Sequence, residues 1–336
     1  MLHRSDQALA RRYDIAVLDL DGVVYVGPHA VPGVPEALTR ARAAGMRLAF
    51  ITNNAARTPT MVAEHLRELG VDAHDDDVVT SAQAAARLCA QTVPEGSAVY
   101  VIGGEGLEVA LRERGLRPVT SPEDDPVAVV QGYGPEMPWR RVVLGAILVR
   151  DGLPWIASNT DMTIPTSTGI GPGNGALVDL VTRYAGRPPQ VAGKPERPLF
   201  EETLLRVGGQ RPLVIGDRLD TDIAGARAMG WDSLLVMTGV TGTAELVAAP
   251  PEQRPTYLAA DLGGLLTPAI APEEADDGWT CGGWRATIVD EAVEVTGEGA
   301  PDDWWRVVAV AAWAHRDESG RVPQADRLAP PGSLGA

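Results

Sequence analysis

Carboxylates stand at the ends of two short apolar stretches of the sequence. The run IAVLDL carries Asp19 at its carboxyl end and continues with Asp21 and Gly22, and the run PLVIGD ends in Asp217. In open α/β sheets the ligand binds beyond the carboxyl ends of the strands, so these carboxylates are expected to converge in one crevice. One carboxylate can attack phosphorus as a nucleophile, and a second can serve as general acid and then as general base.

Three acidic side chains at one edge of a sheet need a counter-charge. Asp19, Asp217 and Asp222 offer the hard oxygen ligands that Mg²⁺ binds, with waters and a substrate phosphate completing the octahedron. Without a cation these groups would repel one another and their pKa values would rise. The pattern therefore predicts a Mg²⁺ site, which would also let an acidic protein bind an anionic substrate.

Phosphate-binding groups are predicted at two further places. The apolar run RLAFIT ends in Thr52 and is followed by Asn53 and Asn54. Lys194, between a glycine and a proline, is the only lysine among 29 basic residues. A compact, flexible ammonium reaches a phosphoryl oxygen where a planar guanidinium fits poorly. Thr52 and Lys194 are therefore predicted to bind phosphate, and Asn54 is predicted to be a turn or capping residue.

Four buried strands are expected to position these groups. Apolar runs predict them at residues 15–20, 47–52, 212–217 and 233–238. Helices are predicted after the first and third runs, where Gly45 and Gly230 provide C-terminal stops. Strands alternating with helices predict parallel βαβ units and an open, doubly wound α/β sheet.

The region between the second and third strands repeats this pattern of strands and helices by itself. It predicts a compact α/β insert over residues 84–188, set into a core made of residues 1–83 and 189–266. Joints rich in Pro and Gly near 186–195 support the second boundary.

Residues 267–336 differ in character from the rest of the chain. They begin with a Pro-rich acidic stretch (267–278) that is predicted to be a linker. A strand or hairpin is predicted at 284–297, a helix at 301–318 and a disordered end at 330–336. Some fifty residues rarely build an independent core, so this small α+β module is expected to dock on the rest of the chain or on another subunit.

The net charge and the cysteine content of the chain limit the kinds of partner that it is expected to bind. A net charge of −16 argues against nucleic acid or an anionic membrane, and leaves a small phosphorylated metabolite as the expected partner. The two cysteines are far apart in sequence and lack a zinc-binding pattern. With no signal-peptide pattern and no apolar run long enough to span a membrane, the sequence predicts a cytoplasmic protein. A homodimer formed through the insert or the C-terminal module stays open.

In this order, the motifs DxDGV, TNN, GKP and GDxxxTD resemble the four motifs of the haloacid dehalogenase (HAD) superfamily of Mg²⁺-dependent phosphatases, over residues 13–266. The insert resembles the cap of the class IIA, NagD-like branch. The resemblance implies an aspartyl-phosphate on Asp19 and an acid–base role for Asp21. Its other implied residues are the Mg²⁺ ligands Asp19, Asp217 and the carbonyl of Asp21, the phosphate-binding Thr52, Asn53 and Lys194, and a supporting Asp222.

Within that branch the chain resembles actinobacterial glycerol 3-phosphate phosphatases, which carry a C-terminal extension. This resemblance rests on the extension, on the preference for Arg over Lys and on the phrase ASNTDMTIPTSTGIGPGNGALVDLV in the insert. In relatives the loop equivalent to 161–168 selects the leaving group, and enzymes acting on pyridoxal phosphate or phosphoglycolate have His or Arg where this chain has Ile164. An apolar residue there implies a small uncharged leaving group such as glycerol. Phosphoglycolate, pyridoxal phosphate and sugar or nucleotide phosphates remain alternatives.

One protein of another class shares part of the pattern. Signalling receivers that are phosphorylated on aspartate also combine clustered Asp residues, a Thr and a Lys around Mg²⁺ on a doubly wound sheet. They keep their phosphate because they lack a general base at the position that Asp21 occupies here. The large insert also fits a cap and not a receiver, so the sequence favours a phosphatase.

Overall fold

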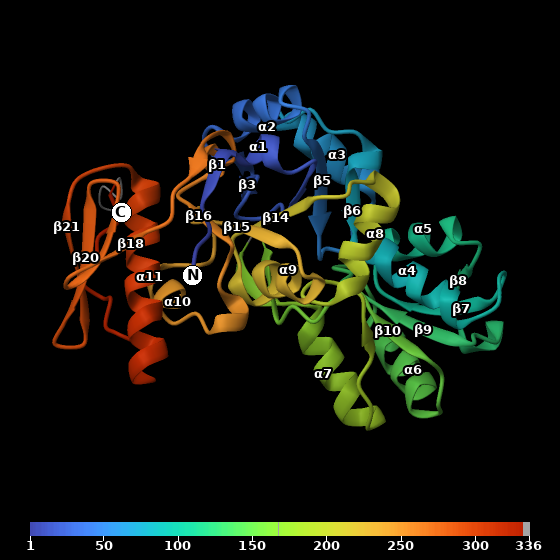
Figure 1. Cartoon of the computed structure of the whole chain (residues 1–336). Helices are drawn as coiled ribbons and strands as arrows, with labels where there is room; N and C mark the ends of the chain where they lie inside the picture. The colour runs from blue at the N-terminus through green and yellow to red at the C-terminus, as the bar shows by residue number, and fades with distance from the viewer. Residues whose placement is uncertain (167, 332–336) are drawn as a thin grey trace. The chain divides into compact units, whose positions relative to one another are not determined.

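A computed structural model of the chain describes residues 1–166 and 168–331. The chain divides into two compact units. The first unit comprises Met1–Leu48, Leu69–Val71 and Gly209–Ala336, and the second comprises Ala49–Glu68 and Asp72–Gly208. The elements of both are labelled in Figure 1.

Four parallel strands in the order β16-β15-β14-β2 form the sheet of the first unit. They are β2 (Ile15–Leu18), β14 (Pro212–Gly216), β15 (Asp232–Val236) and β16 (Tyr257–Ala259). Every residue of β2 and β14 is buried, which explains why both strands appear as unbroken apolar runs in the sequence. The predicted strands and the doubly wound α/β class are thereby confirmed.

Short helices connect these strands. Between β14 and β15 the chain forms a π-helical turn, η3 (Leu219–Ile223), and then α9 (Ala224–Met229), which ends at Gly230 with φ 72°. The remaining elements of this part are β1 (Ser5–Ala8), α1 (Leu9–Arg12), β3 (Tyr25–Val26), β4 (His29–Ala30), α2 (Val34–Ala43), α10 (Thr243–Val247), η4 (Pro251–Gln253), η5 (Leu262–Leu266) and β17 (Pro268–Ala269). Gly45, at φ 93°, lies at the turn after α2, as predicted.

The C-terminal residues form an antiparallel sheet covered by one long helix. The strands are β18 (Glu273–Ala275), β19 (Gly278–Cys281), β20 (Trp284–Val289) and β21 (Ala292–Gly297), and the helix is α11 (Pro301–Ser319). The hairpin and the helix were predicted. The prediction of a linker at 267–278 is wrong, because this stretch contributes β17, which pairs with β1, and the edge strand β18.

Helix α11 packs between the antiparallel sheet and strand β16 (Figure 1). Trp313, which is fully buried, donates its indole N–H to the Leu246 carbonyl at 2.8 Å. The Arg254 guanidinium stacks on the Trp313 ring and makes two hydrogen bonds to Asp317, at 2.6 and 2.7 Å. The expectation that the C-terminal module docks on the rest of the chain is confirmed within this unit.

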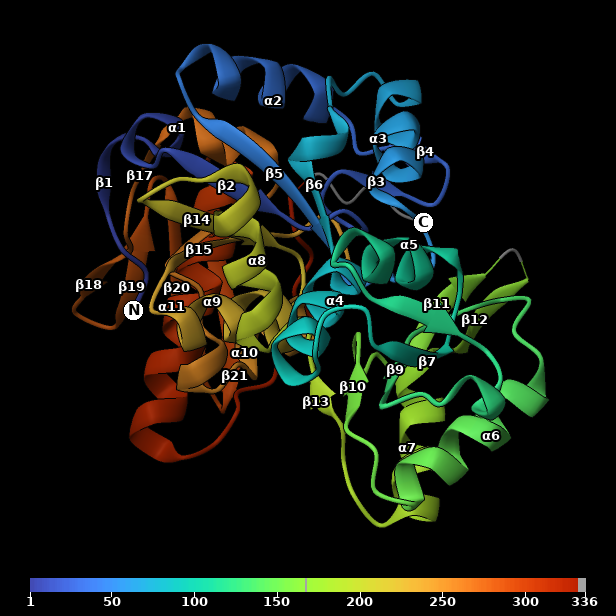
Figure 2. The same cartoon turned by 90° about the vertical axis from the view of Figure 1, so that its right-hand side faces the viewer.

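The second unit contains a five-stranded parallel sheet in the order β13-β10-β9-β7-β8. Its strands are β7 (Ala98–Ile102), β8 (Arg117–Val119), β9 (Ala128–Gln131), β10 (Trp155–Ala157) and β13 (Gln190–Val191). The helices α4 (Ser81–Thr92) and α5 (Glu105–Glu113) lie on one face, and α6 (Trp139–Arg150) and α7 (Asn174–Ala185) on the other (Figure 2). This is the alternation of strands and helices predicted for the insert.

Other elements complete this unit. They are β5 (Arg47–Thr52), which begins in the first unit, α3 (Pro59–Glu68), η1 (Asp75–Asp77), β6 (Val78–Thr80), η2 (Pro122–Asp124) and α8 (Arg197–Val207). Strands β11 (Thr163–Thr166) and β12 (Gly169–Pro172) pair as an antiparallel hairpin, where a loop was expected. The predicted disordered end lies in part outside the described residues, which stop at 331.

Both cysteines are buried and free of disulfides. Burial raises the pKa of Cys89 and of Cys281 to about 12, so neither thiol is a reactive thiolate near neutral pH. Among the described helices, none combines the length and the apolar character needed to cross a bilayer.

Candidate active site

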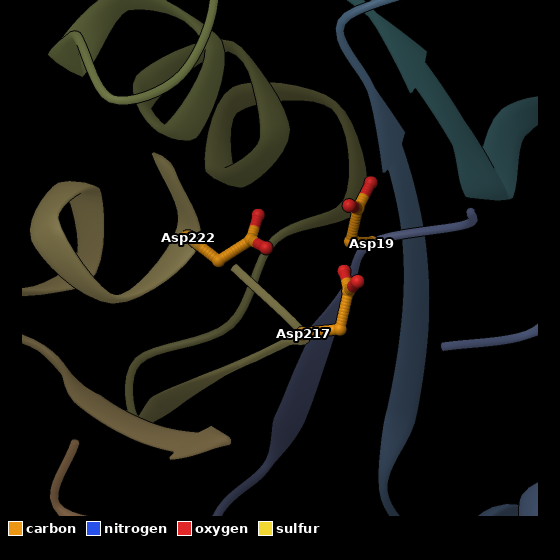
Figure 3. Close-up of side chains that lie close together, drawn as sticks. All are labelled: Asp19, Asp217 and Asp222. Atoms are coloured by element: carbon orange, nitrogen blue, oxygen red, sulfur yellow. The ribbon is translucent and has the colours of Figure 1, made fainter. Parts of the chain in front are cut away.

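Three carboxylates of the first unit lie together. Asp19 directly follows β2, Asp217 directly follows β14, and Asp222 lies in the π-helical turn after them (Figure 3). One carboxylate oxygen of each lies within 4.8 Å of the others. Asp217 and Asp222 have no solvent-exposed surface. Because β2 and β14 are adjacent parallel strands, their carboxyl ends deliver these side chains to the same place.

The carboxylate of Asp217 is held in a tight cradle. It accepts a hydrogen bond from the main-chain N–H of Val240 at 2.6 Å. A Cβ at Gly22 would lie 2.3 Å from its Oδ2, and a Cβ at Gly239 would lie 2.0 Å from the same atom. Gly22 also has φ +83°, a conformation that favours glycine. Side chains at these two positions would therefore displace Asp217.

Asp222 is fixed in a similar way. Its Oδ2 accepts a hydrogen bond from the main-chain N–H of Arg218 at 3.2 Å, across the π-helical turn. A Cβ at Gly216 would lie 2.2 Å from the Asp222 Cβ, so glycine is required where the strand passes this side chain. Single π-turns of this kind are frequent at functional sites.

The donor set fits a hard divalent cation. Three carboxylates offer only oxygen, which suits Mg²⁺ and not a site built from Cys or His. Two fully buried carboxylates beside a third also call for positive charge, since an ionised carboxylate is costly to bury alone. Among the residues that the structure describes, no other group of acidic, His or Cys side chains has this arrangement.

Asp21 occupies a different position from the three clustered carboxylates. It is exposed, and it lies in the turn after β2 where its main chain bridges to Tyr25. The main-chain N–H of Gly22 donates to the Tyr25 carbonyl at 2.8 Å, and the Thr238 hydroxyl donates to the Gly22 carbonyl at 2.5 Å. The turn that carries the exposed Asp21 is thus fixed by these two hydrogen bonds.

In the second unit the structure brings Asn53 and Lys194 together. The main-chain N–H of Lys194 donates to the Asn53 Oδ1 at 2.8 Å, and the Asn53 Nδ2 donates to the Lys194 carbonyl at 3.1 Å. The same Nδ2 lies 3.1 Å from a carboxylate oxygen of Asp161. Both polar atoms of the Asn53 side-chain amide, Oδ1 and Nδ2, are therefore used to hold the lysine main chain and Asp161 in place.

Neighbouring residues also hold Asn53 itself in place, so the hydrogen-bonded contact between Asn53 and Lys194 is rigid. The main-chain carbonyl of Asn53 accepts hydrogen bonds from the Ser81 hydroxyl and the Asn159 side-chain amide, both at 2.6 Å. Gly193 is pressed against it, because a Cβ there would lie 2.5 Å from the Asn53 Oδ1 and 2.5 Å from the Ser158 carbonyl. The glycine of the GKP motif is therefore needed for close approach.

Thr52, Asn54 and Ile164 are also placed. Thr52 is buried, and its hydroxyl accepts the Asn54 main-chain N–H at 3.0 Å. Asn54 accepts the Ala56 N–H at 2.8 Å with its side chain, the turn role that was predicted. Ile164 is partly exposed on β11, opposite Gly171 of β12.

Asp161, Gly239 and Val240 were missed in the sequence. Asp161 follows β10 by a few residues, so the rule that ligands bind beyond the carboxyl ends of strands would have found it if applied to the insert. Gly239 and Val240 lie in a loop after β15 that shows no periodicity. Their roles follow from close contacts alone.

Comparisons with known proteins agree with these observations. A model for haloacid dehalogenase-like hydrolases matches residues 16–117, and a HAD-hydrolase-like model matches residues 191–265. The D-glycerol 3-phosphate phosphatase of Mycobacterium tuberculosis is 40% identical over 323 residues, which cover 92% of this chain and 88% of the relative. The chain belongs to the haloacid dehalogenase-like hydrolase family. It is thus an enzyme of the phosphatase class, which decides against the signalling-receiver alternative.

Other relatives place this HAD hydrolase in the NagD-like branch. An acid sugar phosphatase of Staphylococcus aureus is 34% identical over 258 residues, covering 76% of this chain and 98% of the relative. The crystal structure of the M. tuberculosis glycerol phosphate phosphatase in complex with magnesium matches with a TM-score of 0.84 and 39% identity, over 96% of this chain and 95% of that one. A p-nitrophenyl phosphatase from Archaeoglobus fulgidus matches with a TM-score of 0.69 and 28% identity, over 76% and 98% of the two chains.

Proposed function

We propose that this hydrolase is a Mg²⁺-dependent phosphomonoesterase that forms an aspartyl-phosphate on Asp19. The observation that carries the proposal is the group of three carboxylates, Asp19, Asp217 and Asp222, within 4.8 Å of one another. Bound Mg²⁺ would be held by Asp19, Asp217 and the Asp21 carbonyl, with Asp222 in support, and would supply positive charge against the anionic phosphoryl group.

The residues of the chain then divide the reaction between them. Asp19 attacks phosphorus, and Asp21 protonates the departing alkoxide. Asp21 next removes a proton from water, which hydrolyses the acyl phosphate and restores Asp19. Thr52 and Lys194 bind phosphoryl oxygens, so catalysis depends mostly on positioning and charge. To Asn53 we assign a positioning role, since its amide is engaged with the Lys194 main chain.

Glycerol 3-phosphate is the proposed substrate. The relative named for it aligns over 92% of this chain, which must include most of the C-terminal extension, whereas the sugar phosphatases align over 76%. Ile164, on the β11–β12 hairpin, is apolar and fits a small uncharged leaving group. We also propose that residues 84–188 form the cap, with a core of 1–83 and 189–266 and an extension over 267–336.

The test is phosphate release from a panel of phosphomonoesters with Mg²⁺ or EDTA. The panel contains glycerol 3-phosphate, 2-phosphoglycolate, pyridoxal 5′-phosphate, a nucleoside monophosphate and p-nitrophenyl phosphate. Asp19→Asn removes the nucleophile, and Asp220→Asn is the matched control, because Asp220 is an exposed carboxylate that pairs with Arg218 at 2.8 Å.

Metal-dependent release that is fastest on glycerol 3-phosphate, lost in Asp19→Asn and kept in Asp220→Asn supports the whole proposal. Faster turnover of another ester refutes the assigned substrate and leaves the mechanism standing. Full activity of Asp19→Asn refutes the covalent mechanism.

A further inference from the structure

A cavity opens at the end of the first unit's sheet that lies opposite the three clustered carboxylates. It has a volume of about 610 Å³ and lies at the amino ends of the strands, because Pro212 and Asp232 are the first residues of β14 and β15, and Tyr13 precedes β2. The proposed chemistry instead uses Asp19 and Asp217, at the carboxyl ends. This volume is in the range of cavities that bind small organic molecules. The residues that line it are Ser5, Asp6, Gln7, Arg11, Arg12, Tyr13, Gln210, Arg211, Pro212, Gly230, Trp231 and Asp232.

Three arginines line this cavity in a protein whose net charge is −16. Arg11, Arg12 and Arg211 are exposed. Within residues 1–166 and 168–331, no ion pair joins Arg11 or Arg211 to a carboxylate. Guanidinium groups gathered in a concave site on an acidic protein are a recognition element for anions, which they bind through paired N–H donors.

The carboxylates around the cavity already have other partners. Asp6 pairs with Arg4 at 3.0 Å. Asp14, which follows the lining residue Tyr13 in the chain, accepts main-chain N–H groups of Gln210 and Arg211 at 3.0 and 2.8 Å. Burial acts to raise the pKa of Asp14, but these N–H groups and the nearby positive charge of Arg211 lower it overall, so Asp14 is ionised at neutral pH. Asp14 thus lies near the Arg211 charge, but in the described part of the chain no ion pair joins the two side chains, so the N–H donors of the Arg211 guanidinium remain available to a ligand.

The third carboxylate, Asp232, lines the cavity together with Tyr13. The Tyr13 hydroxyl donates to Asp232 at 2.6 Å, and the Thr256 hydroxyl donates to the same carboxylate at 3.1 Å. Arg12 lies over the Tyr13 ring, 5.8 Å from its centre. Burial, followed by the bond to Asp232, raises the pKa of Tyr13, so the phenol stays neutral. Tyr13 and Asp232 are thus fixed by hydrogen bonds, and Arg12 is held over the Tyr13 ring by a cation–π contact.

We propose that this cavity binds a phosphorylated anion, with Arg11 and Arg211 as the principal contacts. Phosphate oxygens match the planar donors of the two guanidinium groups, and a small organic phosphate matches the volume. The site is separate from the catalytic one, since β2 and β14 run between the two ends of the sheet. The chain therefore has a second place at which phosphorylated metabolites bind without being hydrolysed.

The test is calorimetric titration of the full-length protein with inorganic pyrophosphate in EDTA, where metal-dependent hydrolysis is absent. Arg11→Gln combined with Arg211→Gln is the test variant. Arg140→Gln combined with Arg183→Gln is the control, because it removes the same charge from two exposed arginines of the second unit. Hydrogen–deuterium exchange with and without pyrophosphate then locates the binding site.

We expect the wild-type protein and the control to bind alike, and the test variant to bind at least about tenfold more weakly. Pyrophosphate should slow exchange at residues 5–13, 209–212 and 230–232. Absence of binding to the wild-type protein, equal binding by both variants, or protection confined to residues 52–54 and 193–195 would each overturn the proposal. Because all four arginines are exposed, unfolding does not mask the result, and thermal melting of each variant checks this.

Discussion

Replacing Gly239 by alanine should disable the proposed site although Gly239 is exposed and lies in a loop. The added Cβ would lie 2.0 Å from the Asp217 Oδ2, and such contacts do not occur below 3.0 Å, so this oxygen must move by about 1 Å. The movement also strains the hydrogen bond from the Val240 N–H, now 2.6 Å long. A displacement of about 1 Å at a catalytic group costs on the order of 100-fold in rate, or about 2.7 kcal/mol of transition-state stabilisation.

The assay is kcat/KM for phosphate release over a Mg²⁺ titration, because a displaced ligand should weaken metal binding as well as turnover. Gly104→Ala is the matched control, since a Cβ there meets its nearest atoms at 3.5 Å, an ordinary contact. Both variants should melt within a few degrees of the wild-type protein. A Gly239→Ala enzyme with kcat/KM within about twofold of wild type and unchanged Mg²⁺ dependence would refute the reasoning from the Asp217 cradle.

Three further predictions concern other contacts. Asn53→Ala should raise KM more than tenfold in steady-state assays, because the Lys194 main chain loses two buried hydrogen bonds of about 1 kcal/mol each and the lysine becomes mobile. An unchanged KM would contradict the positioning of Lys194 by Asn53. Trp313→Ala should lower the free energy of unfolding by about 3–5 kcal/mol in urea, whereas Trp139→Ala, at a side chain 59% exposed, should change it by less than about 0.5 kcal/mol. The hydrogen bonds from Arg254 lower the pKa of Asp317, so the ionised carboxylate stabilises the fold above its unfolded pKa, and this contribution is lost as the pH falls through the lowered folded pKa. Asp317→Asn should therefore make the loss of stability at acid pH less steep when unfolding in urea is measured over a range of pH. A pH profile equal to that of the wild-type protein would argue against this role of Asp317.

The sequence sufficed to predict the strands and the clustered carboxylates, because both are local patterns. Asp19 and Asp217 each follow an apolar run with no exposed residue, and one rule about strand ends brings them together. The class of fold follows from the same alternation of strands and helices.

The parts that were missed depend on contacts distant in sequence. Asp161 meets Asn53 across 108 positions, and Val240 meets Asp217 across 23, so neither contact leaves a periodic signal. Strands β17 and β18 have two and three residues and lie in a stretch rich in Pro and acidic residues, which is typical of linkers. Their strand conformation is imposed by pairing with β1 and β19.

The pairing of β1 with β17, and the packing of α11 on β16, have a consequence for synthesis of the chain. The second unit is contained in residues 49–208, so all of it has been synthesised while more than a third of the chain is still to be made. The first unit needs both the earliest strand and the last helix, and its apolar surface around Leu246 and Leu258 stays uncovered until α11 arrives. The three clustered carboxylates, Asp19, Asp217 and Asp222, therefore belong to the part of the protein that matures last.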